Sequence, residues 1–393
     1  MPGTRPLTSV AGALLGSAAL ALALTGCVPN KATAEAQAIA VSIDDTTCSV
    51  KTDTAPAGPI TFQVTNSGTD VNEFEVLAED KLRIAGEKEN IGPGTTVNYV
   101  VQLAEGSYFT ACKKGMAGSA TGLAPFTVTN GAGDAKTAAG SKEVQQAVAD
   151  YTAYVRDQAE QLLAATQQFA AAYESGDDDA ARTRYPAART FYERIEPTAE
   201  QFGDIDPALD LREADVEQGQ EWTGWHRIEK DLWAPAGHTP SDAATRKQLG
   251  DRLVADTRRL SDLVHAKSFA LTLDQISNGA ASLMEEVSRS KITGEEETYS
   301  HTDLWDFKAN VEGADVAYGT VRDLLVAKGG TAKATAATLD AEFAAIDAML
   351  AKYASGDGFV PYTQLSTTQV KELSDQVNAL SEPLSRLTAL LVK

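Results

Sequence analysis

The sequence predicts a multidomain protein in which an all-β sandwich is followed by an all-α helical bundle. Short segments with alternating apolar and polar residues fill residues 38–130, and Gly- and Pro-rich turns separate them, as is typical of half-buried strands. From residue 142 to residue 393 the chain is rich in Ala, Leu, Glu and Gln, and its apolar residues recur with a period near 3.6, which predicts helices. Residues 131–141 are small and without periodicity, as in a flexible linker.

The strand prediction depends on four alternating segments, residues 60–64, 74–76, 97–101 and 126–128. Short strands at this spacing indicate an antiparallel sandwich. The helix prediction depends on two sustained apolar stripes. One begins at Val144 and continues to Leu163, and the other runs from Leu380 to Leu391, and together they indicate a bundle.

The first 26 residues have the layout of a secretory signal peptide. Arg5 is the only charged residue before an apolar run that ends in Leu-Thr-Gly-Cys at residues 24–27. This ending matches the bacterial lipobox, in which the cysteine becomes the acylated first residue of the mature chain. The alternative is a membrane anchor, but a run of about 15 residues is too short to cross a bilayer comfortably. We therefore expect an extracytoplasmic lipoprotein that is attached to the cell membrane only through a lipid on Cys27.

The net charge of −21 argues against nucleic-acid binding, because phosphates require a basic surface. An acidic surface suits the capture of cations, although solubility explains it equally well.

Cys48 and Cys112 both lie in the strand region. Outside the cytoplasm such a pair most often forms a disulfide. The alternative is a metal site that combines the two thiolates with Glu73 and Glu75, whose spacing places both carboxylates on one face of a strand. The residues leave these alternatives open. A blue-copper centre is excluded, because it needs two histidines and none of the four histidines lies in this region.

The segment 224–233 is the strongest candidate for a functional site. If it is helical, six residues recur at steps of three and four and share one stripe: Trp222, Trp225, His226, Glu229, Leu232 and Trp233. A stripe of Trp and Leu should face a core, where a carboxylate needs a partner. A metal ion held by His226 and Glu229 is one such partner.

One imidazole and one carboxylate do not complete a coordination sphere, so other helices must contribute. Glu193 and Glu196 lie on or beside an apolar stripe, and Pro197 would bend the helix there and aim Glu196. Asp210 belongs to a second group of carboxylates ahead of His226. Oxygen-rich coordination with one imidazole favours Fe(II), Fe(III) or Mn(II). The alternative for Glu193, Glu196 and Asp210 is a solvated acidic face.

Several sequence motifs together resemble those of the EfeO-type iron-uptake lipoproteins, which join a cupredoxin-like domain to an imelysin-like helical domain. The similarity covers nearly all of the mature chain. The matching motifs are Glu-Phe-Glu at 73–75, Glu-Asn-Ile-Gly-Pro-Gly at 89–94, Tyr-Glu-Arg-Ile-Glu-Pro at 192–197, Gly-Trp-His-Arg-Ile-Glu-Lys at 224–230, Lys-Ile-Thr-Gly-Glu-Glu-Glu at 291–297, and the segment 299–307.

This resemblance implies an iron-binding component that works with a membrane iron permease and a haem-dependent dye-decolourising peroxidase. The His-x-x-Glu motif of the family matches His226 and Glu229. The ligands proposed for the first domain correspond to Cys48, Cys112 and the Glu73/Glu75 strand, with copper or a second iron as the metal.

Two other functions compete with iron capture. The imelysin class is named for peptidase relatives, but zinc peptidases of the His-Glu-x-x-His type need two histidines on one helical turn, and no second histidine lies near His226. The other reading is a disulfide-stapled scaffold in which His226 and Glu229 form a simple hydrogen-bonded contact. We expect a transport component that captures iron and passes it to the permease.

Overall fold

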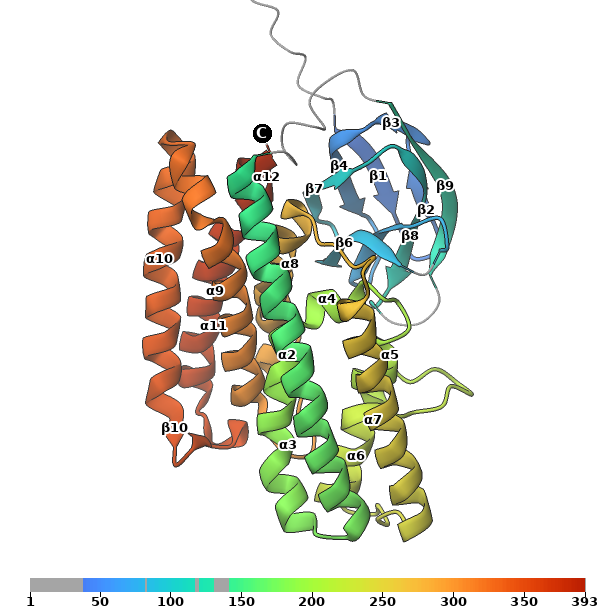
Figure 1. Ribbon diagram of the computed structural model, residues 1–393, viewed down its shortest axis with the longest axis vertical. Coiled ribbons are helices and arrows are strands. Elements are labelled where there is room, and N and C mark those ends of the chain that lie inside the picture. The colour runs from blue at the N-terminus through green and yellow to red at the C-terminus, as the bar shows by residue number, and fades with distance from the viewer. Residues whose placement is uncertain (1–37, 82, 117–119, 131–140, 393) are drawn as a thin grey trace, which may run out of the picture. The chain divides into compact units, whose positions relative to one another are not determined.

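A computed structural model describes residues 38–81, 83–116, 120–130 and 141–392 (Figure 1). Strands occupy the described chain from residue 39 to residue 129, and helices dominate it from residue 142 to residue 392. The predicted order, a β-sandwich followed by a helical region, is therefore confirmed. The predicted signal peptide with Cys27 lies outside the described residues, and so does nearly all of the predicted linker.

The β-region consists of two sheets, with strand orders β2-β1-β4-β7 and β3-β9-β8-β5-β6. The strands are β1 (Ile39–Ile43), β2 (Cys48–Val50), β3 (Thr54–Pro56), β4 (Gly58–Asn66), β5 (Asn72–Leu77), β6 (Ile84–Ile91), β7 (Thr96–Leu103), β8 (Gly106–Lys114) and β9 (Thr121–Thr129). The prediction of a purely antiparallel sandwich is wrong in two places, because β1 pairs with β4 and β3 pairs with β9 in parallel. Alternation of side chains shows that a segment is a strand, but it does not reveal the direction of its neighbour.

Aromatic packing between the sheets forms the core of the sandwich. The ring of Phe62 lies 5.0 Å from the ring of Phe74 and 5.5 Å from that of Phe126, measured between centroids. Phe74 points into this core from β5 and is fully buried. Because alternate residues of a strand face opposite sides, Glu73 and Glu75 lie together on the other face of β5.

A disulfide between Cys48 and Cys112 joins the two sheets, with a Cα–Cα distance of 5.8 Å. Cys48 begins β2 in one sheet, and Cys112 lies in β8 of the other. The two sulfur atoms are bonded to each other, so neither is a thiolate that can bind a metal. The assignment of Cys48 and Cys112 as metal ligands is therefore corrected to a structural disulfide.

The helical region is built around α2, which extends for 34 residues and packs along α3 and α7 (Figure 1). The Ser141 hydroxyl caps its first turn by accepting from the amide of Val144. The helices are α2 (Lys142–Ser175), α3 (Asp178–Glu193), α4 (Glu196–Glu200), α5 (Asp206–Asp210), α6 (Gly224–Trp233), α7 (Ala243–His265), α8 (Leu273–Arg289), α9 (Asp303–Ala327), α10 (Gly330–Leu350), α11 (Thr367–Leu384) and α12 (Leu387–Val392).

Short elements complete this region. They are the 3-10 helices η1 (Glu213–Asp215), η2 (Lys291–Thr293), η3 (Ala351–Tyr353) and η4 (Tyr362–Gln364), and a small hairpin of β10 (Ala354–Ser355) and β11 (Gly358–Phe359). Among the described residues, no helix combines the length and the apolar character that a membrane span requires.

Replacing both cysteines with alanine should lower the free energy of unfolding by about 2–4 kcal/mol, because the disulfide closes a long loop in the unfolded chain. Urea denaturation of the Cys48→Ala/Cys112→Ala variant measures this loss. Reduction of the wild type should reproduce the loss, whereas the same reductant should leave the variant unchanged. Equal denaturation midpoints for the oxidised wild type and the variant would contradict a stabilising disulfide.

Candidate metal centre

The start of α6 is pressed against α5, and this contact places His226 beside Asp210. Gly224 has a φ of +87°, and a Cβ at this position would lie 2.2 Å from the carbonyl oxygen of Leu209. Only glycine combines this backbone conformation with so close an approach. The Thr223 hydroxyl, which donates to the Ala208 carbonyl at 3.1 Å, adds a second tie between the two helices.

The predicted apolar stripe of α6 faces the core of the helical region. Trp225 is fully buried and lies 5.0 Å from the ring of Phe169 and 5.8 Å from that of Tyr185. His226 and Glu229 are buried on the same helix. The inclusion of Trp222 in the stripe is wrong, because α6 begins at Gly224 and the indole N–H of Trp222 donates to the carbonyl of Leu211 instead.

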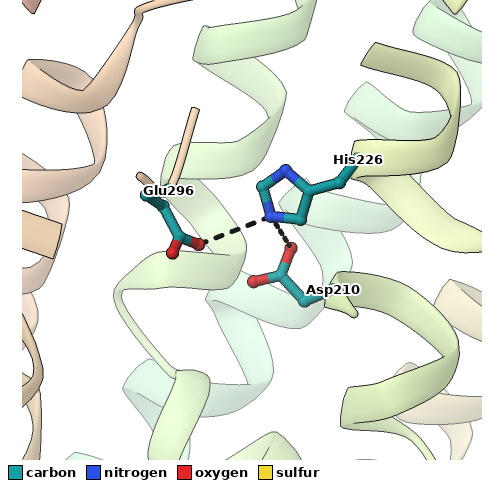
Figure 2. A group of neighbouring side chains, drawn as sticks. All are labelled: Asp210, His226 and Glu296. Carbon is teal, nitrogen blue, oxygen red and sulfur yellow. Dashed lines mark ion pairs between the residues drawn. The ribbon is translucent and has the colours of Figure 1, made fainter. Parts of the chain in front are cut away.

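Two carboxylates approach the Nε2 atom of His226 (Figure 2). Asp210 Oδ1 and Glu296 Oε1 each lie 3.4 Å from this nitrogen. Within the described chain, Nε2 has no hydrogen-bond partner although the side chain is only 2% exposed. One atom from each of these residues lies within 4.8 Å of the others, so that a single ion can reach all three.

Glu229 lies on the opposite side of the imidazole. Its Oε2 is 3.2 Å from His226 Nδ1, and its Oε1 accepts from the amides of Tyr299 at 2.9 Å and Ser300 at 2.7 Å. A carboxylate at Nδ1 fixes the orientation of a metal-binding imidazole and leaves Nε2 free for the ion. A second possible ligand group, made of His226, Glu229 and Glu297, uses this Nδ1 side.

Electrostatics at the imidazole favour its charged form. Burial and the nearby Arg189 lower the pKa of His226, but Asp210, Glu229 and Glu296 outweigh them and raise it well above its ordinary value. Burial also raises the pKa of Glu229, yet its hydrogen bonds from His226 and from the two backbone amides keep that pKa below the usual range. Without an ion, the pair is therefore an imidazolium and a carboxylate, and an incoming cation displaces the imidazolium proton.

The guanidinium of Arg189 lies fully buried among the acidic residues of this centre. It forms ion pairs with Glu193 and Asp210, and its nitrogens lie 3.2 Å from Glu296, 2.6 Å from Glu297 and 3.6 Å from Asp306. Several buried carboxylates therefore share one positive charge, which offsets part of their desolvation cost.

Glu193 and Glu196 are both buried, so the solvated acidic face considered for them is excluded. Both carboxylates instead face Lys291, whose Nζ lies 2.6 Å from Glu193 Oε2 and 3.0 Å from Glu196 Oε2. A possible ligand group connects them to Asp210, but neither lies beside His226.

Pro197 lies in the first turn of a new helix and not at a bend within one helix. The helix α3 ends at Glu193, and α4 begins at Glu196 with the proline in its first turn. Proline is well tolerated there, because its missing N–H is unpaired at the start of any helix. The predicted kink is thus a complete break, and it turns Glu196 toward Lys291.

Of the predicted residues, the structure brings Asp210 and Glu229 to His226, whereas Glu296 was missed. Glu296 follows a turn at Gly294, which has a φ of +76°. Its signal was present in the Lys-Ile-Thr-Gly-Glu-Glu-Glu motif at 291–297, which also contains Lys291.

Asp210 and Glu296 also line a cavity of about 390 Å³. Its other lining residues include the acidic side chains of Glu196, Glu200, Asp206 and Glu286. Burial raises the pKa of all four of these acids, to about 6 for Asp206 and to about 8 for Glu286, so a cation that binds among them displaces protons.

A second group of carboxylates lies in the β-region. Glu73, Glu75 and Glu87 can place one oxygen each within 4.8 Å of the others. Lys113 Nζ lies 3.5 Å from Glu73 and 2.7 Å from Glu75, which confirms that the two carboxylates share one face. Burial raises the pKa of Glu87 to about 8. These donors are oxygen atoms only, so they fit a hard cation better than copper, which prefers sulfur and imidazole.

Asp306 is a buried acid next to the centre. Neither of its oxygens has a hydrogen-bond partner within the described chain. Burial, followed by the neighbouring carboxylates of Glu297 and Glu193, raises the pKa of Asp306 well above its ordinary value. The folded protein therefore binds this proton more tightly than the unfolded chain does.

Below about pH 4, the pKa of an aspartate in the unfolded chain, the tighter proton binding of folded Asp306 contributes its full stabilisation. This contribution is lost as the pH rises toward the raised pKa that Asp306 has in the folded protein. Asp306→Asn removes the titration. We expect the free energy of unfolding of this variant to increase relative to that of the wild type above about pH 4, by up to about 1.4 kcal/mol per pH unit. Denaturation curves at several pH values test this. A difference that does not change with pH would contradict the prediction.

Comparison with known proteins gives two family matches along the chain. A model described as Imelysin matches residues 147–387, and a model described as Cupredoxin-like domain matches residues 16–122. The chain is 35% identical over 362 residues to the iron uptake system component EfeO of Yersinia pestis, covering 91% of this chain and 92% of the relative. It is 34% identical over 363 residues to the protein of the same name from Escherichia coli (strain K12), with coverage of 91% and 92%.

A third relative is called an Efem/EfeO family lipoprotein and comes from Staphylococcus haemolyticus. It is 41% identical over 247 residues, which cover 62% of this chain and 83% of the relative. The buried histidine–carboxylate centre thus lies in the region that matches imelysin, and the similarity to the EfeO proteins extends over nearly the whole chain. The chain belongs to the EfeO family of iron uptake components, with a cupredoxin-like region followed by an imelysin region.

Proposed function

We propose that this protein is the lipid-anchored, extracytoplasmic component that captures iron for an iron uptake system. The observation that carries the proposal is the buried Nε2 atom of His226, which faces Asp210 and Glu296 and has no hydrogen-bond partner within the described chain. An atom in this state is completed by an ordered water or by an ion, and the two carboxylates beside it favour a cation. Relatives named as iron uptake system components support iron as that cation.

Asp210, His226 and Glu296 supply two carboxylates and one imidazole to the captured ion. This donor set suits Fe(II) or Fe(III), which accept both oxygen and nitrogen ligands. Glu229 orients the imidazole from behind through Nδ1. The acidic side chains that line the cavity in front of the centre can also bind a cation that displaces their protons.

The same residues argue against peptidase activity. A zinc peptidase of the His-Glu-x-x-His type places two histidines on one helical turn, whereas Arg227, Ile228, Glu229 and Lys230 follow His226. His238 bonds to Asp231, and His265 bonds to Glu160. We therefore assign the centre to ion capture and transport.

The place of action follows from the N-terminus. The lipobox at residues 24–27 supports attachment to the cell membrane through a lipid on Cys27, and one relative is named a lipoprotein. Capture at that membrane surface suits delivery to an iron permease in the same membrane. A haem-dependent dye-decolourising peroxidase completes the proposed system.

The β-region contributes a second cation site in this proposal, where an incoming ion takes the place of the Lys113 ammonium beside Glu73 and Glu75. Glu73, Glu75 and Glu87 form its ligand group, and the disulfide removes Cys48 and Cys112 from it. Because the remaining donors are oxygen atoms, we favour a second iron over copper there.

Loss of any proposed ligand should weaken iron binding by the helical region. We expect His226→Ala, Asp210→Asn and Glu296→Gln each to lower the affinity for Fe²⁺ at least about tenfold, measured anaerobically against a competing chelator. His265→Ala, which removes an imidazole from α7, is the matched control and should bind as the wild type does. If His226→Ala retained wild-type affinity, the proposed function would fail.

Glu229→Gln separates the two possible ligand groups at His226. If Glu229 only orients the imidazole, this variant should lose about 10–100-fold in affinity, less than His226→Ala loses. Under that reading Glu297→Gln should have little effect on iron binding. Losses in both variants equal to that of His226→Ala would instead assign the ion to the Nδ1 side, with Glu229 and Glu297 as ligands.

A further inference from the structure

The side-chain ammonium of Lys291 occupies a place that resembles a metal seat. It lies 2.6 Å from Glu193 Oε2, 3.0 Å from Glu196 Oε2 and 3.3 Å from Glu286 Oε1. These carboxylates come from α3, α4 and α8, and the whole lysine side chain is buried. Carboxylates from separate helices that converge on one positive charge form the surroundings that a hard cation also prefers.

Asn310 on α9 completes this arrangement. Its Nδ2 donates to Glu193 Oε2 at 3.1 Å and to the Glu193 carbonyl at 2.9 Å. An amide donor at this position fixes the Glu193 carboxylate in one orientation. The carboxylates are therefore held in place around Lys291.

We infer that Lys291 is a tethered cation that fills a second ion seat beside His226 and so limits this centre to one captured ion. The inference rests on the proposed function, because it assumes that iron binds to Asp210, His226 and Glu296. Lys291 keeps Glu193 and Glu196 out of that ligand set by neutralising them. Among the three proposed ligands of the ion, Lys291 forms an ion pair only with Glu296, at 3.9 Å.

Lys291 also bears on the affinity of the captured ion. Its Nζ lies 3.9 Å from Glu296 Oε1, the same oxygen that faces His226. A fixed positive charge a few ångströms from a bound cation weakens its binding, and the interior of a protein screens such repulsion poorly. Such weaker binding helps a carrier that must release its ion. A substitution of Arg189 could not test this charge effect separately from ligand binding, because Arg189 pairs directly with the proposed ligand Asp210.

The test is the number of iron ions that Lys291→Met binds. Under anaerobic conditions with saturating Fe²⁺, we expect the purified full chain of this variant to hold one more ion than the wild type, as measured by metal analysis after removal of free iron. The first ion should bind at least about tenfold more tightly than in the wild type. An unchanged ion count would overturn the inference.

Two further variants define the seat. Lys291→Met/Glu196→Gln removes one carboxylate together with the ammonium, and its ion count should return to that of the wild type. Lys308→Met is the matched control, since it removes a lysine of α9 that pairs with Glu312 and Asp347 away from the centre, and it should change neither the count nor the affinity. An extra ion in Lys308→Met would also overturn the inference.

Loss of Lys291 leaves buried carboxylates without a counter-charge, so the variant is also followed by thermal unfolding. If it is unfolded or destabilised without metal, Fe²⁺ should raise its melting temperature by more than it raises that of the wild type. An equal or smaller rise would count against a second seat. The proposed function fails separately, if the wild type and His226→Ala bind iron equally.

Discussion

The helical region depends on how a group of buried carboxylates is neutralised. Arg189 is fully buried and pairs with acidic side chains from α3, α5, α9 and the segment that precedes α9. Leaving such carboxylates charged and unpaired would cost several kcal/mol each. Arg189 and Lys291 offset this cost, and burial lowers it further by raising the pKa of Asp306, which favours the neutral form of that acid. The helices can therefore pack around an acidic interior in the absence of a metal ion.

Within that interior, neighbouring carboxylates have different partners. The imidazole of His226 has one side tied to Glu229 and the other directed at Asp210 and Glu296. The contact between Gly224 and Leu209 brings His226 and Asp210 together, because it sets the approach of α6 to α5. Lys291 holds Glu193 and Glu196. In the proposed function, ion capture and charge balance thus use neighbouring carboxylates for separate tasks.

The fold could largely be predicted from the sequence, because a period of two residues marks strands such as β4 and a period of 3.6 residues marks helices such as α2. The direction of strand pairing could not, since parallel and antiparallel neighbours leave the same alternation in a strand. At the site, His226 and Glu229 could be predicted because a polar group on an apolar helix needs a partner, and Asp210 because it belongs to a group of carboxylates ahead of His226. Glu296 was missed because it lies in a turn, where no periodic stripe marks a buried residue.

The cation that pairs with Glu193 and Glu196 could not be predicted from the sequence. A ligand role and a solvated acidic face were both considered for them, and their burial excludes the second, yet the sequence contains no record of which cation lies closest to them. Lys291 follows them by almost a hundred residues and reaches them only through tertiary packing. The cysteines present the same difficulty, because a disulfide and a thiolate site have the same spacing along the chain.

The position of that disulfide has a consequence for the order in which the chain matures. The chain has cysteines only at residues 27, 48 and 112, so both partners of the bond precede the first residue of α2. Chains generally fold domain by domain from the N-terminus as they emerge. The disulfide between the two sheets can therefore form while the helical region is still extended. The helical region contains no cysteine, so its later folding supplies no thiol that could exchange with this disulfide.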